Sequence, residues 1–268
     1  MARPAAGALA ALAGAFALHA VSPQAAYASH ALVSLVLFCQ FSATYVINDV
    51  FDVTQDAVNH PDRALARGVV SRRMAFASAM ALFVASLIFA AGLGWAALAF
   101  TAANNVLFFT YSSLKRWHAI TANFVASYFV TATLLLGGIV GGAPSALVPV
   151  FLLLFAFVLG REIVCDVHDL PGDREAGLAT LPLRRGRAAA FRVTWSLLAA
   201  VCAGAIAWAA LGPVSQPWLF VALVGAILGL YSVRLWRYQR RGCERSYRDV
   251  RAAGYVGLAL AVPLLLAL

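Results

Sequence analysis

The feature that most constrains this chain is the repetition of long apolar stretches along almost its whole length. Nine stretches, each roughly the 20 residues that a helix needs to cross a bilayer, lie at 5–22, 27–48, 74–92, 95–111, 119–141, 145–163, 189–211, 215–236 and 250–268. Of the 268 residues, 63% are hydrophobic and only 12% are charged, about half the charged share of a soluble domain. A soluble fold could not bury so much apolar surface. The sequence therefore predicts an all-α integral membrane protein, a bundle of nine transmembrane helices formed by a single domain over residues 1–268.

The first stretch is the weakest of the nine, because it is short and rich in alanine. An alternative is a signal peptide, with Arg3 as its basic end and Ala26-Tyr27-Ala28 as its cleavage site. The distribution of charge favours nine retained spans. A different count would place basic residues on both sides of the membrane.

All basic residues fall on one side of the predicted membrane. They are Arg3 before the first span, Arg63, Arg67, Arg72 and Arg73 after the second, Lys115 and Arg116 after the fourth, Arg161, Arg174, Arg184, Arg185, Arg187 and Arg192 around the sixth and seventh, and Arg234, Arg237, Arg240, Arg241, Arg245, Arg248 and Arg251 around the eighth and ninth. The eleven acids share these segments, whereas the connections near 23–26, 93–94, 142–145 and 212–214 carry no charge. The positive-inside rule then predicts a multi-pass protein with a cytoplasmic N-terminus, an outside C-terminus and active-site loops in the cytoplasm.

Two other functions, nucleic-acid binding by the basic residues and metal binding by the cysteines, are disfavoured. The basic residues form no continuous patch or recognition motif, so we expect no nucleic-acid partner. The cysteines Cys39, Cys165, Cys202 and Cys243 are scattered without metal-ligand spacing, and we expect them to be reduced and mostly buried.

The first acidic stretch runs from Asn48 to Asp56 at the end of the second span. Asp49, Asp52 and Asp56 are spaced by three and four residues, so on a helix they share one face. Three carboxylates on one face repel each other. A hard divalent cation would relieve the repulsion, and oxygen ligands suit Mg²⁺.

A second acidic stretch repeats this spacing after the sixth span. Each aspartate follows its counterpart by 117 residues: 49 to 166, 52 to 169 and 56 to 173. The match predicts two halves of one site, facing each other across the bundle. Pro171 and Gly172 should end or kink the helix, so we expect Asp173 to reach the site from a loop.

Other interpretations of the acids are weaker. They could be solvated loop charges that answer the nearby arginines, but two triads of identical spacing on one side favour a site. Neither stretch has the ligand series of an EF-hand. Zinc is disfavoured because His60, His118 and His168 are isolated in sequence and no cysteine pair accompanies them.

Cations surround the two triads in sequence, among them Arg63, Arg67, Arg174 and Lys115, the only lysine. Metal ions ringed by cations are typical of a site for a multiply charged phosphate. At a bilayer surface, an isoprenoid diphosphate fits, with its head at the metals and its tail among the helices. Ionisation of its allylic C–O bond would give a carbocation, which needs a dry pocket with aromatic faces. Of the many aromatic residues, we single out Tyr111 as a candidate.

These residues resemble the UbiA-type intramembrane prenyltransferase superfamily over nearly the whole chain. The resemblance rests on four blocks, which are Asn48 to Asp56, Pro61 to Gly68, Tyr111 to Arg116, and Asp166 to Asp173 continued through Ala176-Gly177 to Thr180-Leu181-Pro182. It implies a nine-helix fold, Mg²⁺ dependence, a prenyl diphosphate donor and a lipophilic acceptor alkylated at carbon or oxygen. It also implies catalytic roles for Lys115 and Tyr111, diphosphate contacts from Arg63, Arg67, Lys115 and Arg174, and metal ligation by Asn48, Asp49, Asp52, Asp56, Asp166, Asp169 and Asp173.

The second block departs from part of the superfamily and leaves the acceptor open. It is similar to the form found in the branch with chlorophyll, tocopherol and archaeal glyceryl-ether enzymes, and less similar to the 4-hydroxybenzoate branch. Cys165 stands where that branch often has Lys, and His168 where an acid is common. Arg67 follows Leu65-Ala66, where the family commonly has Arg-Pro-Leu, and Ala64 stands in the place of the arginine before the proline. The acceptor could be an aromatic quinone precursor or another hydroxylated lipid.

Two other functions remain alternatives to prenyl transfer. A UbiA-type terpene cyclase would ionise the same donor and quench the cation within the substrate. A cation or solute transporter would place ionisable residues at mid-span, where the predicted spans have no Asp, Glu, Lys or Arg.

Overall fold

The computed structural model describes residues 3–117, 119–212, 214–262 and 265, and it describes the side chains of these residues outside 3–5 and 112–120. Within them the chain forms eleven α-helices and one 3₁₀ helix. In chain order these are α1 (Arg3–Val21), α2 (Tyr27–Phe51), α3 (Val53–Asn59), α4 (Arg72–Ala91), α5 (Trp95–Trp117), α6 (Ala119–Val140), η1 (Pro144–Leu147), α7 (Val148–His168), α8 (Leu170–Glu175), α9 (Leu181–Leu211), α10 (Pro217–Arg241) and α11 (Glu244–Ala261).

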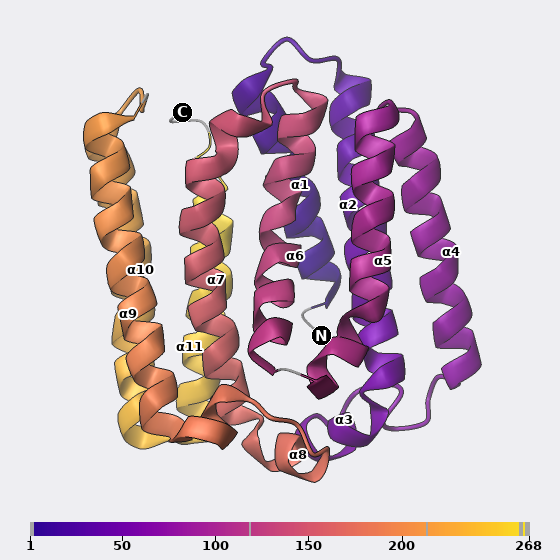
Figure 1. Cartoon of the computed structure of the whole chain (residues 1–268), viewed down its shortest axis with the longest axis vertical. Coiled ribbons are helices and arrows are strands. Elements are labelled where there is room, and N and C mark those ends of the chain that lie inside the picture. Colours follow the sequence, from indigo (N-terminus) through magenta and orange to yellow (C-terminus); the bar gives the residue numbers. More distant parts are fainter. Residues whose placement is uncertain (1–2, 118, 213, 263–264, 266–268) are drawn as a thin grey trace.

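The long helices run side by side, and the two short ones, α3 and α8, lie at one end of the bundle (Figure 1). Each predicted span falls mainly within one long helix. By length and composition, six segments of the described chain can cross a membrane, and they are Tyr27–Phe51, Arg72–Ala91, Thr121–Val140, Pro144–His168, Leu181–Leu211 and Pro217–Arg241. The all-α, multi-pass membrane architecture is confirmed.

Two of the remaining long helices, α1 and α11, fall short of a full apolar span for visible reasons. In α1 the described apolar segment is the shorter Ala6–Val21. α11 begins with a charged segment that extends from Glu244 to Arg251, and its described part ends at Ala261. Only the second half of α11 is therefore apolar within the described residues.

Two packed halves make up the bundle. In the C-terminal half, α7, α9, α10 and α11 share a core that includes Phe157 and Tyr231, whose ring centroids lie 5.1 Å apart. In the N-terminal half, Phe41 of α2 stacks on Phe129 of α6 at 3.8 Å. Helix α6 packs against both α1 and α7, so it joins the two halves along the middle of the bundle.

A polar network inside the N-terminal half fixes three spans relative to one another. Gln40 of α2 donates to Asn105 Oδ1 of α5 at 2.7 Å, and Asn105 donates to Ser86 Oγ of α4 at 3.0 Å. All three residues are buried. Interhelical hydrogen bonds of this kind hold spans together where the hydrophobic effect between helices is absent.

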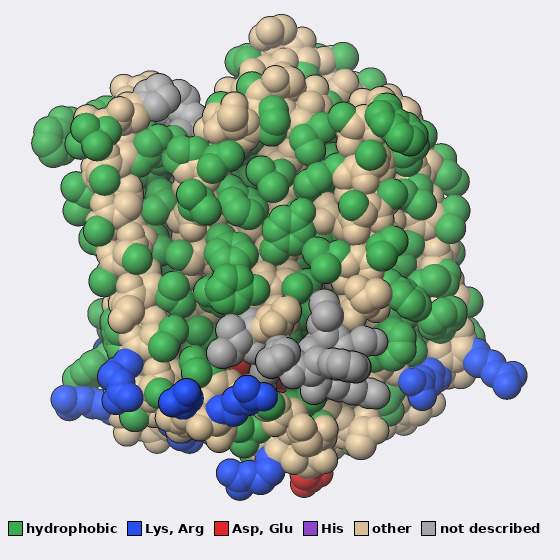
Figure 2. Space-filling view, in the orientation of Figure 1, with side chains coloured by type: hydrophobic (Ala, Val, Ile, Leu, Met, Phe, Trp, Pro, Cys, Tyr) green, Lys and Arg blue, Asp and Glu red, His purple; other side chains and the backbone are tan. Residues whose placement is uncertain are grey.

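Positive charge gathers at the end of the bundle where α3 and α8 lie, which we call the charged end. Figure 2 shows Lys and Arg side chains along this end, while hydrophobic side chains cover much of the face above it. The structure thus agrees with the predicted segregation of charge. Arg161 is 8% exposed and lies within α7, because this helix continues to His168. The sequence places Arg161 at the edge of the sixth span, and the structure shows that it is buried there.

The local structure corrects three expectations. The helix carrying the first triad is not continuous, because α2 ends at Phe51 and α3 begins at Val53. Asp173 belongs to a short helix rather than a loop, since the break falls at Asp169 and Pro171 occupies the first turn of α8, where its missing N–H costs nothing. Among the four free cysteines only Cys39 is buried, while Cys202 and Cys243 are exposed.

Candidate active site

The first aspartate stretch is held together by an arginine from the following loop. Asp49 lies in the last turn of α2 and Asp56 in α3, where it is 4% exposed. Arg63 Nη1 lies 3.3 Å from Asp49 Oδ1 and also forms an ion pair with Asp56. The guanidinium thus relieves part of the repulsion between these carboxylates, a role that sequence reasoning assigned to a metal ion alone.

Neutral donors and histidines contact the second aspartate stretch. Asn123 of α6 donates to Asp166 Oδ2 at 2.7 Å. His168 Nδ1 lies 2.8 Å from Asp169 Oδ1, and His60 Nε2 lies 3.7 Å from the same oxygen. Asp173, which is 2% exposed, accepts a hydrogen bond from Gln55 of α3. The three carboxylates therefore have partners from α3, α6, α7 and the loop after α3.

The two stretches meet through α3 and α8, as the repeated spacing predicts. Besides the Gln55–Asp173 bond, Asn59 donates to the Asp169 carbonyl at 3.0 Å and accepts from the Gly172 N–H at 2.9 Å. Any side chain at position 172 would overlap the Asn59 amide. Glycine at this position therefore allows the close approach of the two halves.

A small polar cavity of about 30 Å³ lies where the halves meet. All three aspartates of the second stretch line it, together with side chains from both halves, namely Gln55, Ala122, Asn123, Leu178 and Thr180. On this measure one water needs about 10–15 Å³, so the cavity has room for an ion or a pair of water molecules.

His60 and His168, far apart in sequence, lie together at this site. Their rings are 6.5 Å apart, His168 stacks on Tyr247 at 3.6 Å, and its Nε2 lies 2.8 Å from Glu244 Oε2. Burial acts to raise the pKa of Asp169, but the hydrogen bonds from His168 and His60 outweigh it and bring the pKa below its usual range. Asp169 is therefore ionised throughout the physiological pH range.

The ligand chemistry of these residues fits a hard cation, because their side chains offer oxygen donors. The described side chains contain no group of three or more His, Cys, Asp or Glu already arranged to hold a metal ion. Arg63, Asn123, Gln55 and the two histidines contact the carboxylates instead. Ligation by the seven predicted residues stays a prediction.

The other predicted residues are spread around this centre. Asn48 and Asp52 are half-buried beside Asp49, and Tyr111 is half-buried on α5. Arg67 and Arg174 are exposed at the charged end. Lys115 belongs to α5, but its side chain lies outside those that the structure describes, as does His118.

Sequence reasoning missed three neutral residues of the site, Asn123, Gln55 and Asn59. Asn123 carried a usable signal, because a polar amide within a membrane span is costly unless it serves a site or a helix contact. Gln55 and Asn59 carried none beyond their places within and just after the first triad, since Gln and Asn are common in loops.

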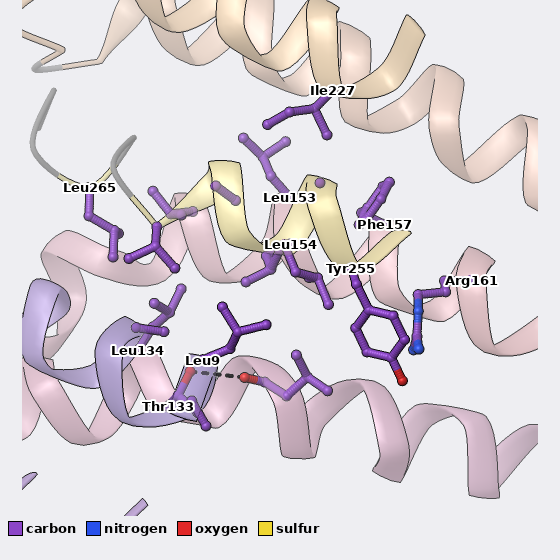
Figure 3. Close-up of a pocket in the computed structure, with 18 of the residues that line it drawn as sticks. Leu9, Thr133, Leu134, Leu153, Leu154, Phe157, Arg161, Ile227, Tyr255 and Leu265 are labelled. Atoms are coloured by element: carbon purple, nitrogen blue, oxygen red, sulfur yellow. Dashed lines mark hydrogen bonds between the residues drawn. The ribbon is translucent and has the colours of Figure 1, made fainter. Parts of the chain in front are cut away.

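An apolar cavity of about 120 Å³ extends into the bundle between its two halves. Figure 3 shows its lining, which includes Leu134, Leu153, Leu154, Phe157 and Ile227. Arg161 and Tyr255 lie next to each other at one end, with the guanidinium carbon 4.6 Å from the ring centroid. The chain thus combines a cluster of aspartates at its charged end with a mainly apolar cavity in its interior.

Comparison with known proteins identifies the family that shares this arrangement. The model of the UbiA prenyltransferase family matches residues 5–261. The chain belongs to this family. It is therefore a membrane-embedded prenyltransferase, and the resemblance seen in the sequence is confirmed.

Two relatives and one solved structure illustrate the similarity. Digeranylgeranylglyceryl phosphate synthase of Methanopyrus kandleri is 38% identical over 195 residues, which cover 70% of this chain and 69% of that protein. The synthase of the same name from Ignicoccus hospitalis is 33% identical over 267 residues, covering 96% and 83%. A UbiA homolog from Archaeoglobus fulgidus, solved with GPP and Mg²⁺, has the same fold, with a TM-score of 0.74 at 18% identity and coverage of 97% and 95%.

Proposed function

We propose that this prenyltransferase moves an isoprenyl group from a prenyl diphosphate to a hydroxyl group of a glycerol phosphate lipid. The observation that carries the proposal is the meeting of two aspartate stretches at one end of an apolar cavity. The similarity to digeranylgeranylglyceryl phosphate synthases supports the choice of acceptor over an aromatic quinone precursor.

The donor's diphosphate binds at the charged end. Asn48, Asp49, Asp52 and Asp56 from one half, with Asp166, Asp169 and Asp173 from the other, would hold Mg²⁺. The A. fulgidus homolog with GPP and Mg²⁺ supports the choice of metal and of donor class. When bound, the metal neutralises the diphosphate and makes it a better leaving group. Arg63, Arg67, Lys115 and Arg174 add cations from the protein, and Tyr111 lies toward the C-terminal end of α5.

The donor's prenyl chain enters the apolar cavity. Its volume of about 120 Å³ is roughly ten times that needed for one water on the same measure. Aromatic side chains such as Phe41, Tyr45 and Phe157 line it, so an allylic cation would meet ring faces rather than water.

The reaction then requires one bond to form and one to break. The C–O bond between the allylic carbon and the diphosphate breaks, and the diphosphate leaves with the electron pair. The acceptor hydroxyl oxygen bonds to the allylic carbon, and its proton passes to the departing diphosphate. The cations of the protein contribute most at this step, because the charge on the diphosphate grows as the bond ionises.

A product assay with the full-length chain in nanodiscs tests this function. Labelled geranylgeranyl diphosphate and Mg²⁺ are supplied with a glyceryl ether phosphate that has a free hydroxyl, with an aromatic hydroxy acid, or with no acceptor. We expect a product whose mass equals the glyceryl acceptor plus one prenyl group. A cyclised hydrocarbon formed without acceptor, or prenylation of the aromatic acid alone, would contradict the proposal.

We also infer that the charged end faces the cytoplasm, because the basic residues gather there. Single cysteines near residues 70, 116, 186 and 240 should react with an impermeant thiol reagent from the cytoplasmic side only. A cysteine at Gln24, in the uncharged connection after α1, is the control and should react from outside. Labelling of the 234–251 segment from outside would overturn the orientation.

A further inference from the structure

One charged side chain extends into the apolar cavity. Among the described residues that line it, Arg161 is the only one with a charge. It is 8% exposed and lies in α7, well inside the bundle. A buried cation in a membrane protein is costly and is kept where it serves a pathway or a ligand.

The hydrogen bonds of Arg161 leave part of its guanidinium available. Nη1 donates to Glu162 Oε1 at 2.5 Å, but the buried Nε has no hydrogen-bond partner in the described chain. The Tyr255 ring covers the guanidinium carbon at 4.6 Å. Because a guanidinium carries five N–H donors in a planar fork, one carboxylate bond leaves capacity for a second anion.

The neighbouring helix makes room for this side chain. A Cβ atom on Gly254 of α11 would lie 3.0 Å from Arg161 Cδ and 3.2 Å from Nε. Glycine at 254 and the ring at 255 therefore form one wall of the place that the guanidinium occupies. The arginine is held in a defined position at the end of the cavity (Figure 3).

The position of Arg161 relative to the aspartates suggests what it binds. Arg161 precedes Asp166 by five residues in α7, a rise of about 7.5 Å along the helix. It therefore lies between the carboxylates at the charged end and the apolar interior. An anion at this point would be close to the allylic carbon of a donor whose diphosphate lies at the aspartates.

We propose that Arg161, supported by Tyr255 and Gly254, binds the phosphate monoester of the acceptor and directs its hydroxyl toward the allylic carbon of the donor. This inference rests on the proposed function and adds the place and the chemistry of acceptor recognition. The planar fork suits a phosphate, which accepts two parallel hydrogen bonds.

The test compares two acceptors, of which only one carries the phosphate group. One is a glyceryl ether phosphate with a free hydroxyl, and the other carries a methoxy group in place of the phosphate. The full-length wild type, Arg161→Met, Arg161→Lys and the control Arg192→Met, which changes an exposed arginine of α9, are assayed in nanodiscs. For each, kcat/KM is measured with both acceptors, and donor KM is measured separately.

We expect the wild type to prefer the phosphate acceptor and Arg161→Met to lose about tenfold or more of that preference through a higher acceptor KM. Arg161→Lys should keep part of the preference, because it retains the charge without the fork. Arg192→Met should keep all of it. Gly254→Ala, which retains the cation but displaces it, should also lower the preference, and this variant serves if Arg161→Met does not fold.

Several results would overturn the inference while leaving prenyl transfer intact. Equal losses with both acceptors would indicate a structural ion pair with Glu162. A higher donor KM with an unchanged acceptor preference would place Arg161 at the donor's diphosphate. A wild type that does not distinguish the two acceptors would exclude a phosphate site. If the wild type alkylated neither acceptor, the proposed function itself would fail.

Discussion

The two aspartate stretches share their spacing but differ in what compensates their charge. In the first, Arg63 contacts both Asp49 and Asp56. In the second, Asp166 and Asp173 accept hydrogen bonds from the neutral amides of Asn123 and Gln55, and Asp169 lies beside two histidines. An internal repeat in sequence has therefore produced two halves that are not electrostatically equal.

This difference suggests that the two stretches have different roles in binding the metal ion and the diphosphate. The described partners of the second stretch are neutral amides and histidines, so we expect this stretch to dominate binding of the divalent cation. Arg63 contacts the carboxylates of the first stretch, and we expect it to contact the diphosphate as well when the donor is bound. The following predictions test this difference in roles.

The largest effect is expected from removing one carboxylate of either half. Asp49→Ala and Asp169→Ala should each abolish turnover while the protein stays folded and inserted, because each removes an anion on which metal binding depends. The measurement is turnover at saturating Mg²⁺. The control is Asp62→Ala, which changes an exposed acid of the loop after α3. A variant that keeps more than about a tenth of the wild-type rate, a cost below about 1.4 kcal/mol, would show that its aspartate is not a ligand.

The sequence predicts the bundle and the meeting of its halves for physical reasons. Apolar stretches of membrane length can form only helices or closed barrels. The segregation of charge then indicates which ends of the helices lie on the same side of the membrane. The repeat of 49, 52 and 56 at 166, 169 and 173 correctly places both triads together. What it does not give is the break at Asp52 and Asp169, because propensity favours a continuous helix at the first position and a stop at Pro171 at the second.

Contacts between distant segments also lie beyond the sequence pattern. His168 directly precedes Asp169 in the chain, but only the packing of α3 on α8 brings His60 to the same carboxylate. Arg161 is similar, since its place in the interior depends on α7 continuing beyond residue 163 and on the space left by Gly254. In both cases the position of the side chain depends on packing between helices, which the sequence pattern does not show.

A second prediction compares two arginines of the charged end. Arg63→Gln should lower kcat/KM for the donor by about ten- to a hundredfold, because it removes a positioned cation from the diphosphate and from two aspartates. Arg174→Gln should cost about threefold, since Arg174 is exposed and solvent screens its charge. Equal effects of the two substitutions would contradict the special role of Arg63.

A third prediction separates the donor from the acceptor. Lys115→Ala should raise donor KM and lower kcat, together about tenfold, because a positioned cation is worth more as the diphosphate gains charge. Arginine at 115 should restore only part of the activity, since its planar fork cannot replace a compact ammonium. Acceptor KM should stay nearly constant, and a change in acceptor KM alone would place Lys115 in the acceptor pocket.

The smallest effect at saturating metal is expected from Asn123, the neutral donor of the second half. Asn123→Ala removes the hydrogen bond that orients Asp166, and losses of this kind typically weaken metal binding by about 10- to 100-fold. The Mg²⁺ concentration for half-maximal activity should therefore rise by about tenfold or more, while kcat at saturating Mg²⁺ falls only a few-fold. Thr121→Ala, an exposed residue two positions earlier in α6, should leave the Mg²⁺ requirement unchanged. If Asn123→Ala lowered kcat without changing that requirement, Asn123 would act on the substrate rather than on the metal, and the second half would not depend on neutral donors for its cation.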